Sequence, residues 1–324
     1  MKKICKNDIN LNDAITCGQI FRYFVTNDKY TLILSDRVVE LYEDNEYIYA
    51  TSNNETNLEN ILINFLDLNR DYEKINQYLI NNDNSLKTII ESCKGFKIIN
   101  SPSFEMIISY MISANNNVRN ITRAVNNLSE KYGKEIIFND KKYYLFPSLD
   151  DMKKLNLEDY INLKLGFRSK YIYDFVKNIN EEDINKINEL DTISAIKYLT
   201  SFNGIGLKIA SCILLFGYKR LDVFPIDTWV KKYMMDNYGF ADINKIKEYA
   251  TSDHHKTVTS SDRDARDKKT ESTRPATGNQ AATKGNYRSR SHLKAAEPRS
   301  GNLQTSGQEQ AAGRILQRIL KHIV

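Results

Sequence analysis

The stretch from residue 191 to residue 239 constrains the fold of this chain more than any other. Apolar residues at helical spacing lead into Asn203-Gly204-Ile205-Gly206, and a second apolar run extends from Leu207 to about Phe216. The two glycines allow a tight turn and a close approach to the backbone. Free N–H groups at the start of the second helix favour an anion such as a phosphate. The pattern predicts a helix-hairpin-helix over residues 191–217.

Two charged residues in the same stretch indicate chemistry as well as binding. Lys208 falls in the first turn of the second helix, where the helix dipole disfavours a cation, and a lysine there suits nucleophilic chemistry. Asp227 follows Phe224-Pro225-Ile226 and precedes an apolar helical run, so it is predicted to cap a helix. Asp227 lies 19 positions after Lys208, which is enough for a helix and a loop to return Asp227 to Lys208.

Composition excludes several kinds of site. The chain has 324 residues, of which 41% are apolar, so it can hold two sizeable domains. All four histidines lie after residue 250, which removes histidine bases and histidine–metal sites from the body of the chain. The four cysteines are scattered without a Cys-x-x-Cys pair, so we expect no metal site and no disulfide framework.

Positive charge is concentrated in the last 74 residues. Of the 46 Lys and Arg and the 41 Asp and Glu in the chain, 14 and 7 lie after residue 250, and the first 250 residues therefore hold 32 and 34. The overall positive charge cannot be used to infer that the body binds nucleic acid.

There is no apolar run long enough to span a membrane and no apolar signal core at Met1–Lys6, so we expect a cytoplasmic protein.

Periodicity predicts an α+β fold that is mainly helical. Residues 1–95 are expected to form an N-terminal antiparallel sheet domain with helices, since alternating β-branched and aromatic stretches at 30–34, 37–42 and 47–50 are separated by turn residues. Helical patterns at 55–132 and from 143 onward place a helical domain at 96–250, with the Asp227 loop at 222–230. Residues 251–324 differ in composition and are predicted to be a disordered or foreign tail.

The motifs Gly-Ile-Gly-x-Lys and Phe-Pro-Ile-Asp, with Cys-Gly-Gln-x-Phe-Arg-Tyr at residues 17–23, resemble the helix-hairpin-helix DNA glycosylases, and in particular the bacterial type of 8-oxoguanine DNA glycosylase and AP lyase. The resemblance covers about residues 8–250. It implies that the predicted N-terminal sheet domain is similar to the family's TBP-like domain. It implies that Lys208 is the nucleophile and that Asp227 stabilises charge on the sugar. It implies base recognition by Gly18 and Cys212, and DNA contacts by Asn115, Phe167, Arg168, Gly204, Gly206 and Trp229.

Each of these residues also has a structural interpretation. Gly18 could be a turn glycine, Asn115 part of a polar helix junction, and Phe167 and Cys212 core residues. Lys208 could be a surface lysine and Asp227 a plain helix cap. Asn120 stands where animal members carry an arginine that reads the orphaned cytosine, which leaves the preference for the opposite base open.

The resemblance implies an enzyme that excises 8-oxoguanine from double-stranded DNA and then cleaves the strand by β-elimination, acting as a monomer without a cofactor. Carbonyl groups of the hairpin are candidates for holding a monovalent cation. Two alternatives stay open: a helix-hairpin-helix glycosylase for another lesion, and a DNA-binding module without catalysis. The pair Lys208 and Asp227 favours an enzyme, whereas the different sequence after residue 250 favours the binding module.

Overall fold

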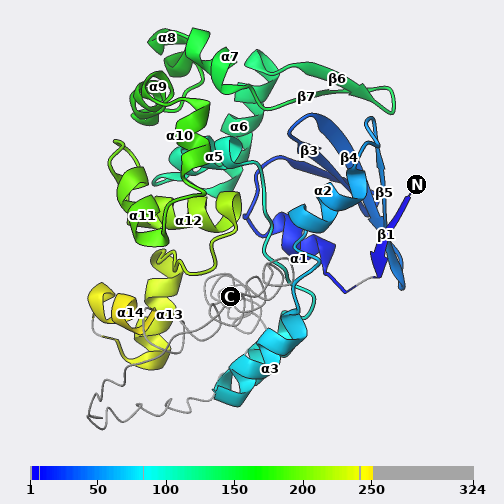
Figure 1. Cartoon of the computed structure of the whole chain (residues 1–324), viewed down its shortest axis with the longest axis vertical. Helices are drawn as coiled ribbons and strands as arrows, with labels where there is room; N and C mark the ends of the chain where they lie inside the picture. The colour runs from blue at the N-terminus through cyan, green and yellow to red at the C-terminus, as the bar shows by residue number, and fades with distance from the viewer. Residues whose placement is uncertain (1, 7, 83, 241, 251–324) are drawn as a thin grey trace, which may run out of the picture. The chain divides into compact units, whose positions relative to one another are not determined.

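A computed structural model describes residues 2–6, 8–82, 84–240 and 242–250 of the chain. These residues form two compact units, one ending at Pro225 and the other beginning at Ile226 (Figure 1). The tail predicted for residues 251–324 lies outside the described residues. Among the helices of the described residues, none has both the length and the apolar character needed to cross a membrane.

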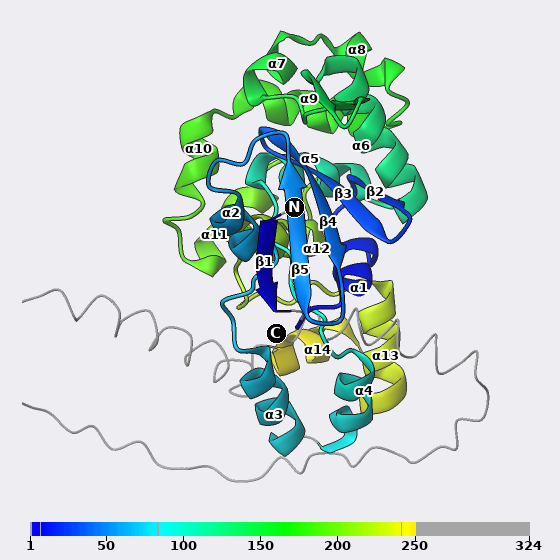
Figure 2. The same cartoon turned by 90° about the vertical axis from the view of Figure 1, so that its right-hand side faces the viewer.

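The N-terminal part of the first unit contains a five-stranded antiparallel sheet in the order β1-β5-β4-β3-β2 (Figure 2). The strands are β1 (Lys2–Lys6), β2 (Tyr23–Thr26), β3 (Lys29–Leu34), β4 (Arg37–Glu43) and β5 (Tyr47–Ser52). Tight turns join them where Asn27, Asp28 and Ser35 adopt positive φ. Strands β3, β4 and β5 in the centre confirm the predicted antiparallel sheet. The edge strands β1 and β2 were not predicted.

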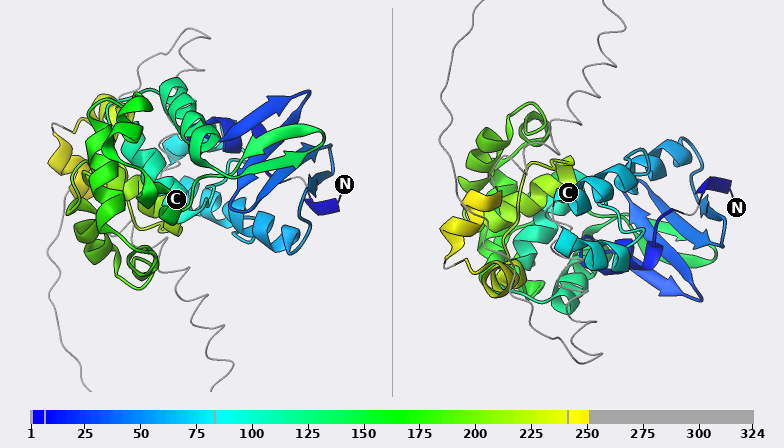
Figure 3. Two further views of the ribbon diagram at one scale, coloured as in Figure 1. Left: turned by 90° about the horizontal axis from the view of Figure 1, so that it is seen from above. Right: turned by 90° about the horizontal axis from the view of Figure 1, so that it is seen from below.

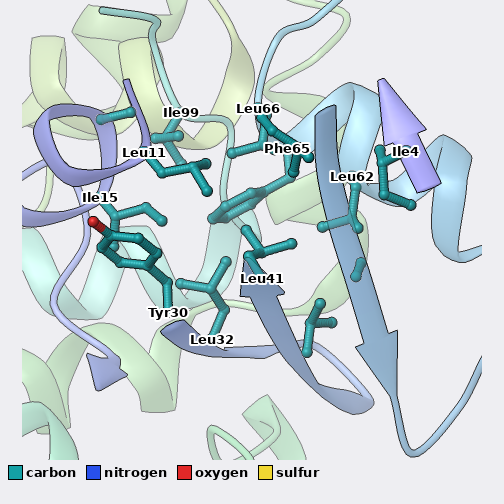
Figure 4. Packing of buried hydrophobic residues seen from close by; sticks show 14 of the residues in the cluster. Ile4, Leu11, Ile15, Tyr30, Leu32, Leu41, Leu62, Phe65, Leu66 and Ile99 are labelled. Carbon is teal, nitrogen blue, oxygen red and sulfur yellow. The ribbon is translucent and has the colours of Figure 1, made fainter. Parts of the chain in front are cut away.

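Helices α1 (Leu11–Thr16) and α2 (Leu58–Phe65) cover one face of this sheet. Their apolar residues meet the inward residues of β3 and β4, including Leu32 and Leu41, in one continuous core (Figure 4). The apolar face of α2, which lies in the predicted helical stretch 55–132, supplies Leu58, Leu62 and Phe65 to this core. Alternation along the strands and helical spacing in α2 therefore converge on the same buried layer.

The rest of the first unit is helical, and it lies beside the sheet in the views from above and below (Figure 3). Its elements are α3 (Tyr72–Asn82), η1 (Asn84–Leu86), α4 (Lys87–Ser92), α5 (Ser103–Ser113), α6 (Val118–Tyr132), α7 (Leu149–Lys154), α8 (Leu157–Asn162), α9 (Arg168–Asn178), α10 (Glu181–Lys186), α11 (Thr192–Thr200) and α12 (Leu207–Tyr218). The strands β6 (Glu135–Phe138) and β7 (Lys141–Tyr144) form a hairpin between α6 and α7. The helical prediction for residues 143 and 144 is wrong, because both pair within this hairpin.

Helices α5 and α12 are the most buried of this helical part. Every residue of α5 from Glu105 to Ile112 is buried, as is every residue of α12 from Ile209 to Tyr218. A helix that is buried on all sides lies in the interior of a protein, so these two helices form the centre around which the others pack. The second unit contains α13 (Thr228–Tyr238) and α14 (Ile243–Ala250), which contact each other.

A buried ion pair joins the loop before β2 to α5. Arg22 Nη1 lies 3.2 Å from Glu105 Oε2, and both side chains are almost fully buried. The same guanidinium donates from Nη2 to the carbonyl of Tyr144 in β7. Burial raises the pKa of Glu105, and the charge and hydrogen bond of Arg22 oppose that rise. The pair therefore connects the sheet, the central helix and the β6–β7 hairpin.

We expect Arg22→Ala to lower the free energy of unfolding by about 3–5 kcal/mol, because the carboxyl group of Glu105 would remain buried without its partner. Urea denaturation measures the change. The control is Lys2→Ala, which breaks the exposed Lys2–Glu59 pair and should leave the urea midpoint unchanged within error. Equal midpoints for Arg22→Ala and the wild type would show that the buried pair does not stabilise the fold.

Candidate active site

Lys208 lies in the first turn of α12, as the sequence predicts. The helix begins at Leu207 with Gly206 as its N-cap residue, and the Lys208 side chain is half-buried. Its Nζ lies 5.8 Å from the centroid of the Tyr110 ring, a separation at which a cation and an aromatic face attract each other. The amine of the candidate nucleophile is therefore placed over an aromatic ring of the central helix α5.

Cys212 lies one turn further along α12 and is 3% exposed. The pKa of the Tyr110 hydroxyl is held well above its usual range. Burial is the main cause, and the neighbouring thiols of Cys212 and Cys17 add to it. Tyr110 is therefore a protonated hydrogen-bond donor at neutral pH. Its environment includes Lys208, Cys212 and the loop that contains Gly18, and the resemblance assigns these residues to the nucleophile and to base recognition.

Gly18 lies in a fixed loop directly after α1. Its φ is +94°, a conformation that side chains rarely adopt, so a glycine is required here by the backbone. The next side chain, Gln19, is fully buried and bonded to three backbone groups of the chain: Nε2 donates to the carbonyls of Ala14 (3.1 Å) and Lys97 (3.0 Å), and Oε1 accepts from the N–H of Ile99 (2.9 Å). The interpretation of Gly18 as a turn glycine is confirmed, and its role in base recognition stays a prediction.

Asn115 lies in the connection between α5 and α6, with a φ of +50° and an exposed side chain. The guanidinium of Arg168 holds this connection. Its Nε donates to the carbonyl of Ala114 (2.8 Å), its Nη2 donates to the carbonyls of Ala114 and Asn115 (2.9 Å to the latter), and its Nη1 donates to Leu165 (3.1 Å). Four of the five N–H groups of Arg168 are thus engaged by backbone carbonyls.

Phe167 precedes Arg168 at the start of α9 and is 54% exposed. The alternative interpretation of Phe167 as a core residue is therefore wrong, and its role as a DNA contact stays a prediction. Its ring lies 4.5 Å from the guanidinium carbon of Arg168 and packs edge-on against Tyr171. An exposed aromatic ring held by two neighbours has the geometry needed to insert between bases.

The connection from α11 to α12 contains Gly204 and Gly206, which differ in their constraints. Gly204 has a φ of +88°, and a Cβ there would lie 2.8 Å from the ring of Tyr171. Gly206 has an extended backbone, with φ of −90° and ψ of 176°, and a Cβ there would meet nothing within 4 Å. The fold requires a glycine at position 204, whereas nothing among the residues that the structure describes requires one at position 206.

A polar groove of about 810 Å³ lies beside the Asn115 connection. Its lining includes four basic side chains, those of Arg123, Lys131, Lys164 and Arg168, and one acidic side chain, that of Glu130. Asn120 also lines it, and its side-chain oxygen accepts a hydrogen bond from Arg123 Nη2 (3.1 Å). The groove is therefore electropositive and lies next to the exposed Asn115.

Asp227 caps α13 in the second unit. Its Oδ1 accepts from the N–H of Val230 (2.8 Å), and its carbonyl accepts from the N–H of Lys231 (2.9 Å), so the predicted N-cap is confirmed. Trp229 belongs to α13, but its side chain lies outside what the structure describes.

Comparison with known proteins identifies the family. Residues 3–107 match the description "8-oxoguanine DNA glycosylase, N-terminal domain". A crystal structure of the Clostridium acetobutylicum 8-oxoguanine glycosylase/lyase, in complex with double-stranded DNA containing cytosine opposite 8-oxoguanine, superposes with a TM-score of 0.71 at 33% identity, covering 75% of this chain and 85% of that one. The chain belongs to the 8-oxoguanine DNA glycosylase family.

Two curated relatives match over a smaller share of their length. A probable N-glycosylase/DNA lyase of Methanothermobacter thermautotrophicus is 29% identical over 52% of this chain and 60% of the relative. The N-glycosylase/DNA lyase of Saccharomyces cerevisiae is 28% identical over 49% of this chain and 46% of the relative. The chain thus spans about half of the length of these two relatives.

Sequence reasoning did not identify Tyr110 or Gln19 as site residues. Tyr110 lies within an apolar helical run, where a tyrosine is typical of a core, and Gln19 stands out in the sequence only as part of the motif around Gly18. The available signal was a hydroxyl in an otherwise apolar helix, since a buried hydroxyl needs a partner.

We expect Gly204→Ala to lower the free energy of unfolding by at least about 1–2 kcal/mol, the usual cost of left-handed backbone for a residue with a Cβ. The displaced Tyr171 ring adds to this cost. Gly206→Ala is the matched control, and it should leave stability unchanged or raise it by up to about 1 kcal/mol. Thermal or urea unfolding of both variants measures the difference, and equal destabilisation would contradict the assignment.

Proposed function

We propose that this chain is a bifunctional enzyme that removes 8-oxoguanine from double-stranded DNA and then cleaves the strand at the resulting abasic site. The observation that carries the proposal is the half-buried Lys208 at the start of α12, beside Tyr110, in a chain of this family. The proposed assignment takes residues 1–95 as the sheet domain and 96–250 as the glycosylase domain. A monomer acts on the DNA.

Lys208 is the nucleophile of the proposed reaction. Its neutral amine attacks C1′ of the deoxyribose, a C–N bond forms, and the bond from C1′ to the base breaks with its electron pair leaving on the base. Loss of the ring oxygen from C1′ gives a Schiff base, and β-elimination then cleaves the strand on the 3′ side of the lesion. Asp227 stabilises the positive charge that develops on the sugar. Its cap bonds to α13 hold its carboxylate in place.

Base recognition is assigned to the carbonyl of Gly18 and to Cys212. The family assigns the Gly18 carbonyl to the N7–H that 8-oxoguanine has and guanine lacks. The φ of +94° and the buried hydrogen bonds of Gln19 support this role, because a recognition carbonyl must keep a fixed direction. Cys212 is assigned to the face of the extruded base.

Contact with DNA is assigned to four features of the chain. The α11–α12 connection is the helix-hairpin-helix, where Gly204 forms the turn and Gly206 allows a phosphate to approach the backbone. Phe167 wedges into the duplex and Asn115 fills the gap that the extruded base leaves, which their exposure supports. The basic groove around Arg123 and Arg168 suits the complementary strand. Trp229 is retained as a phosphate contact, and a monovalent cation at the hairpin carbonyls stays a prediction.

Two other functions remain as alternatives. A family member with another preferred lesion would use the same lysine with a different base. A DNA-binding module would use the hairpin alone. The first differs from the proposal in its substrate, and the second differs in lacking a covalent intermediate.

We expect borohydride to trap a covalent adduct between the chain and a duplex that carries 8-oxoguanine opposite cytosine, because reduction fixes the Schiff base of Lys208. Lys208→Gln should give no adduct. The matched control is Lys197→Gln, which removes an exposed lysine of α11 and should trap as the wild type does. The readout is the fraction of DNA shifted on a denaturing gel.

A duplex with a pre-formed abasic site separates the alternatives, since it needs the lysine but no base pocket. Trapping on the abasic duplex alone would indicate another lesion. Binding of both duplexes with no adduct on either would indicate a DNA-binding module. Trapping that persists in Lys208→Gln would show that a different amine is the nucleophile.

We expect Gly206→Ala to weaken binding to duplex DNA about tenfold, since the added methyl group would keep a phosphate from the N–H groups at the start of α12. Damaged and undamaged duplexes should weaken by the same factor, because phosphate contacts carry no sequence information. Fluorescence anisotropy gives both dissociation constants. Unchanged binding by a folded Gly206→Ala would remove the hairpin from the DNA interface.

A further inference from the structure

Tyr110 occupies a fixed position in the centre of the first unit. It is 4% exposed and lies in the middle of α5. Its ring packs edge-on against Phe21 at 5.7 Å and stacks on Phe216 of α12 at 5.7 Å with an interplanar angle of 12°. Rings held on two sides in this way have little freedom to rotate.

The Tyr110 hydroxyl contacts the loop that contains Gly18. It donates to the backbone carbonyl of Gln19 at 3.2 Å, across 91 residues of sequence. The Gln19 side chain is itself bonded to Ala14, Lys97 and Ile99. Gln19, the residue after Gly18, is thus held by hydrogen bonds to its side chain and to its backbone carbonyl. The hydrogen bond to the carbonyl comes from Tyr110.

The ring of Tyr110 contacts the other half of the site. Lys208 Nζ lies 5.8 Å from the ring centroid, and the ring lies beside Phe216 on the same helix as Lys208. A ring alone would satisfy the packing, so phenylalanine would serve at this position if the core were the whole role of the residue. The hydroxyl adds one specific bond, and that bond goes to the recognition loop.

We propose that Tyr110 is a positioning residue that sets the distance between the recognition carbonyl of Gly18 and the amine of Lys208. The hydroxyl fixes the loop, and the ring face fixes the lysine. The two ends of this side chain act on different steps: base excision needs both the loop and the lysine, whereas cleavage at a pre-formed abasic site needs the lysine alone. The inference rests on the proposed glycosylase and lyase function.

Two substitutions separate the two ends. Tyr110→Phe keeps the ring and removes the bond to Gln19, so single-turnover excision of 8-oxoguanine should slow about tenfold, while cleavage of an abasic duplex should stay within about twofold of the wild type. Tyr110→Leu removes the ring, so both reactions should slow about tenfold or more. The dissociation constant for DNA should not change in either variant, because the residues assigned to contact with DNA lie elsewhere.

Tyr160→Phe is the matched control. Tyr160 is also a buried tyrosine whose hydroxyl donates to a backbone carbonyl, that of Met152 at 2.9 Å, and it lies in α8 outside the site. This variant should lose thermal stability as Tyr110→Phe does and keep both rates within about twofold of the wild type.

Three outcomes would overturn the inference. The first is wild-type excision by Tyr110→Phe. The second is an equal loss of both reactions in Tyr110→Phe, which would indicate a purely structural role. The third is unchanged cleavage of the abasic duplex by Tyr110→Leu. A wild type that cleaves the abasic duplex but not the 8-oxoguanine duplex would instead overturn the proposed substrate, and unchanged abasic cleavage by Tyr110→Leu would still overturn the action of the ring on Lys208.

Discussion

The close approach of α12 to the start of α5 is the contact on which the candidate site in the first unit depends. Gly217 makes it possible, because a Cβ there would lie 3.1 Å from Met106 Cβ and 3.3 Å from Ser103 Cα. The Ser103 hydroxyl donates to the Gly217 carbonyl at 2.7 Å and fixes the two helices at this end. With the backbones in contact here, α12 runs back along α5, and the Tyr110 ring can stack on Phe216 and reach Lys208. A Cβ at position 217 would force Met106 or Ser103 to shift by a few tenths of an ångström at this contact.

Three connections of the site contain a residue in the left-handed region, and each is held by a side chain. Gly18 is followed by Gln19, whose buried carboxamide bonds to three backbone groups. The backbone around Asn115 is held by Arg168 of α9, and the turn at Gly204 lies against the ring of Tyr171 of α9. Left-handed backbone persists where the surrounding structure determines it. The structure therefore fixes the three loops to which base recognition and DNA contacts are assigned in the proposed function.

The sequence predicts what local patterns determine. The central strands, the start of α12 and the cap at Asp227 follow from alternation, glycine placement and capping within a few residues. Strand β1 could not be found in this way, since its sequence Lys-Lys-Ile-Cys-Lys is polar and it becomes a strand by pairing with β5. The same limit applies to the bond of Tyr110, which spans 91 residues, and to the bonds of Arg168 to the Asn115 connection, which span 53 and 54. Tertiary contacts of this kind carry no local signature.

The hydrogen bonds that Arg168 makes within the chain bear on how its guanidinium could contact DNA. The resemblance assigns Arg168 to a DNA contact, yet four of its five N–H groups are bonded to the carbonyls of Ala114, Asn115 and Leu165. One N–H is available without loss of a backbone bond, and a bidentate contact with a base would release part of the Asn115 connection. A single hydrogen bond discriminates less between bases than a bidentate pair does. Asn120, the residue that replaces a further arginine of the animal enzymes, already has its side-chain oxygen bonded to Arg123. Arg168 could therefore offer a base one hydrogen bond while it still holds the connection at Asn115.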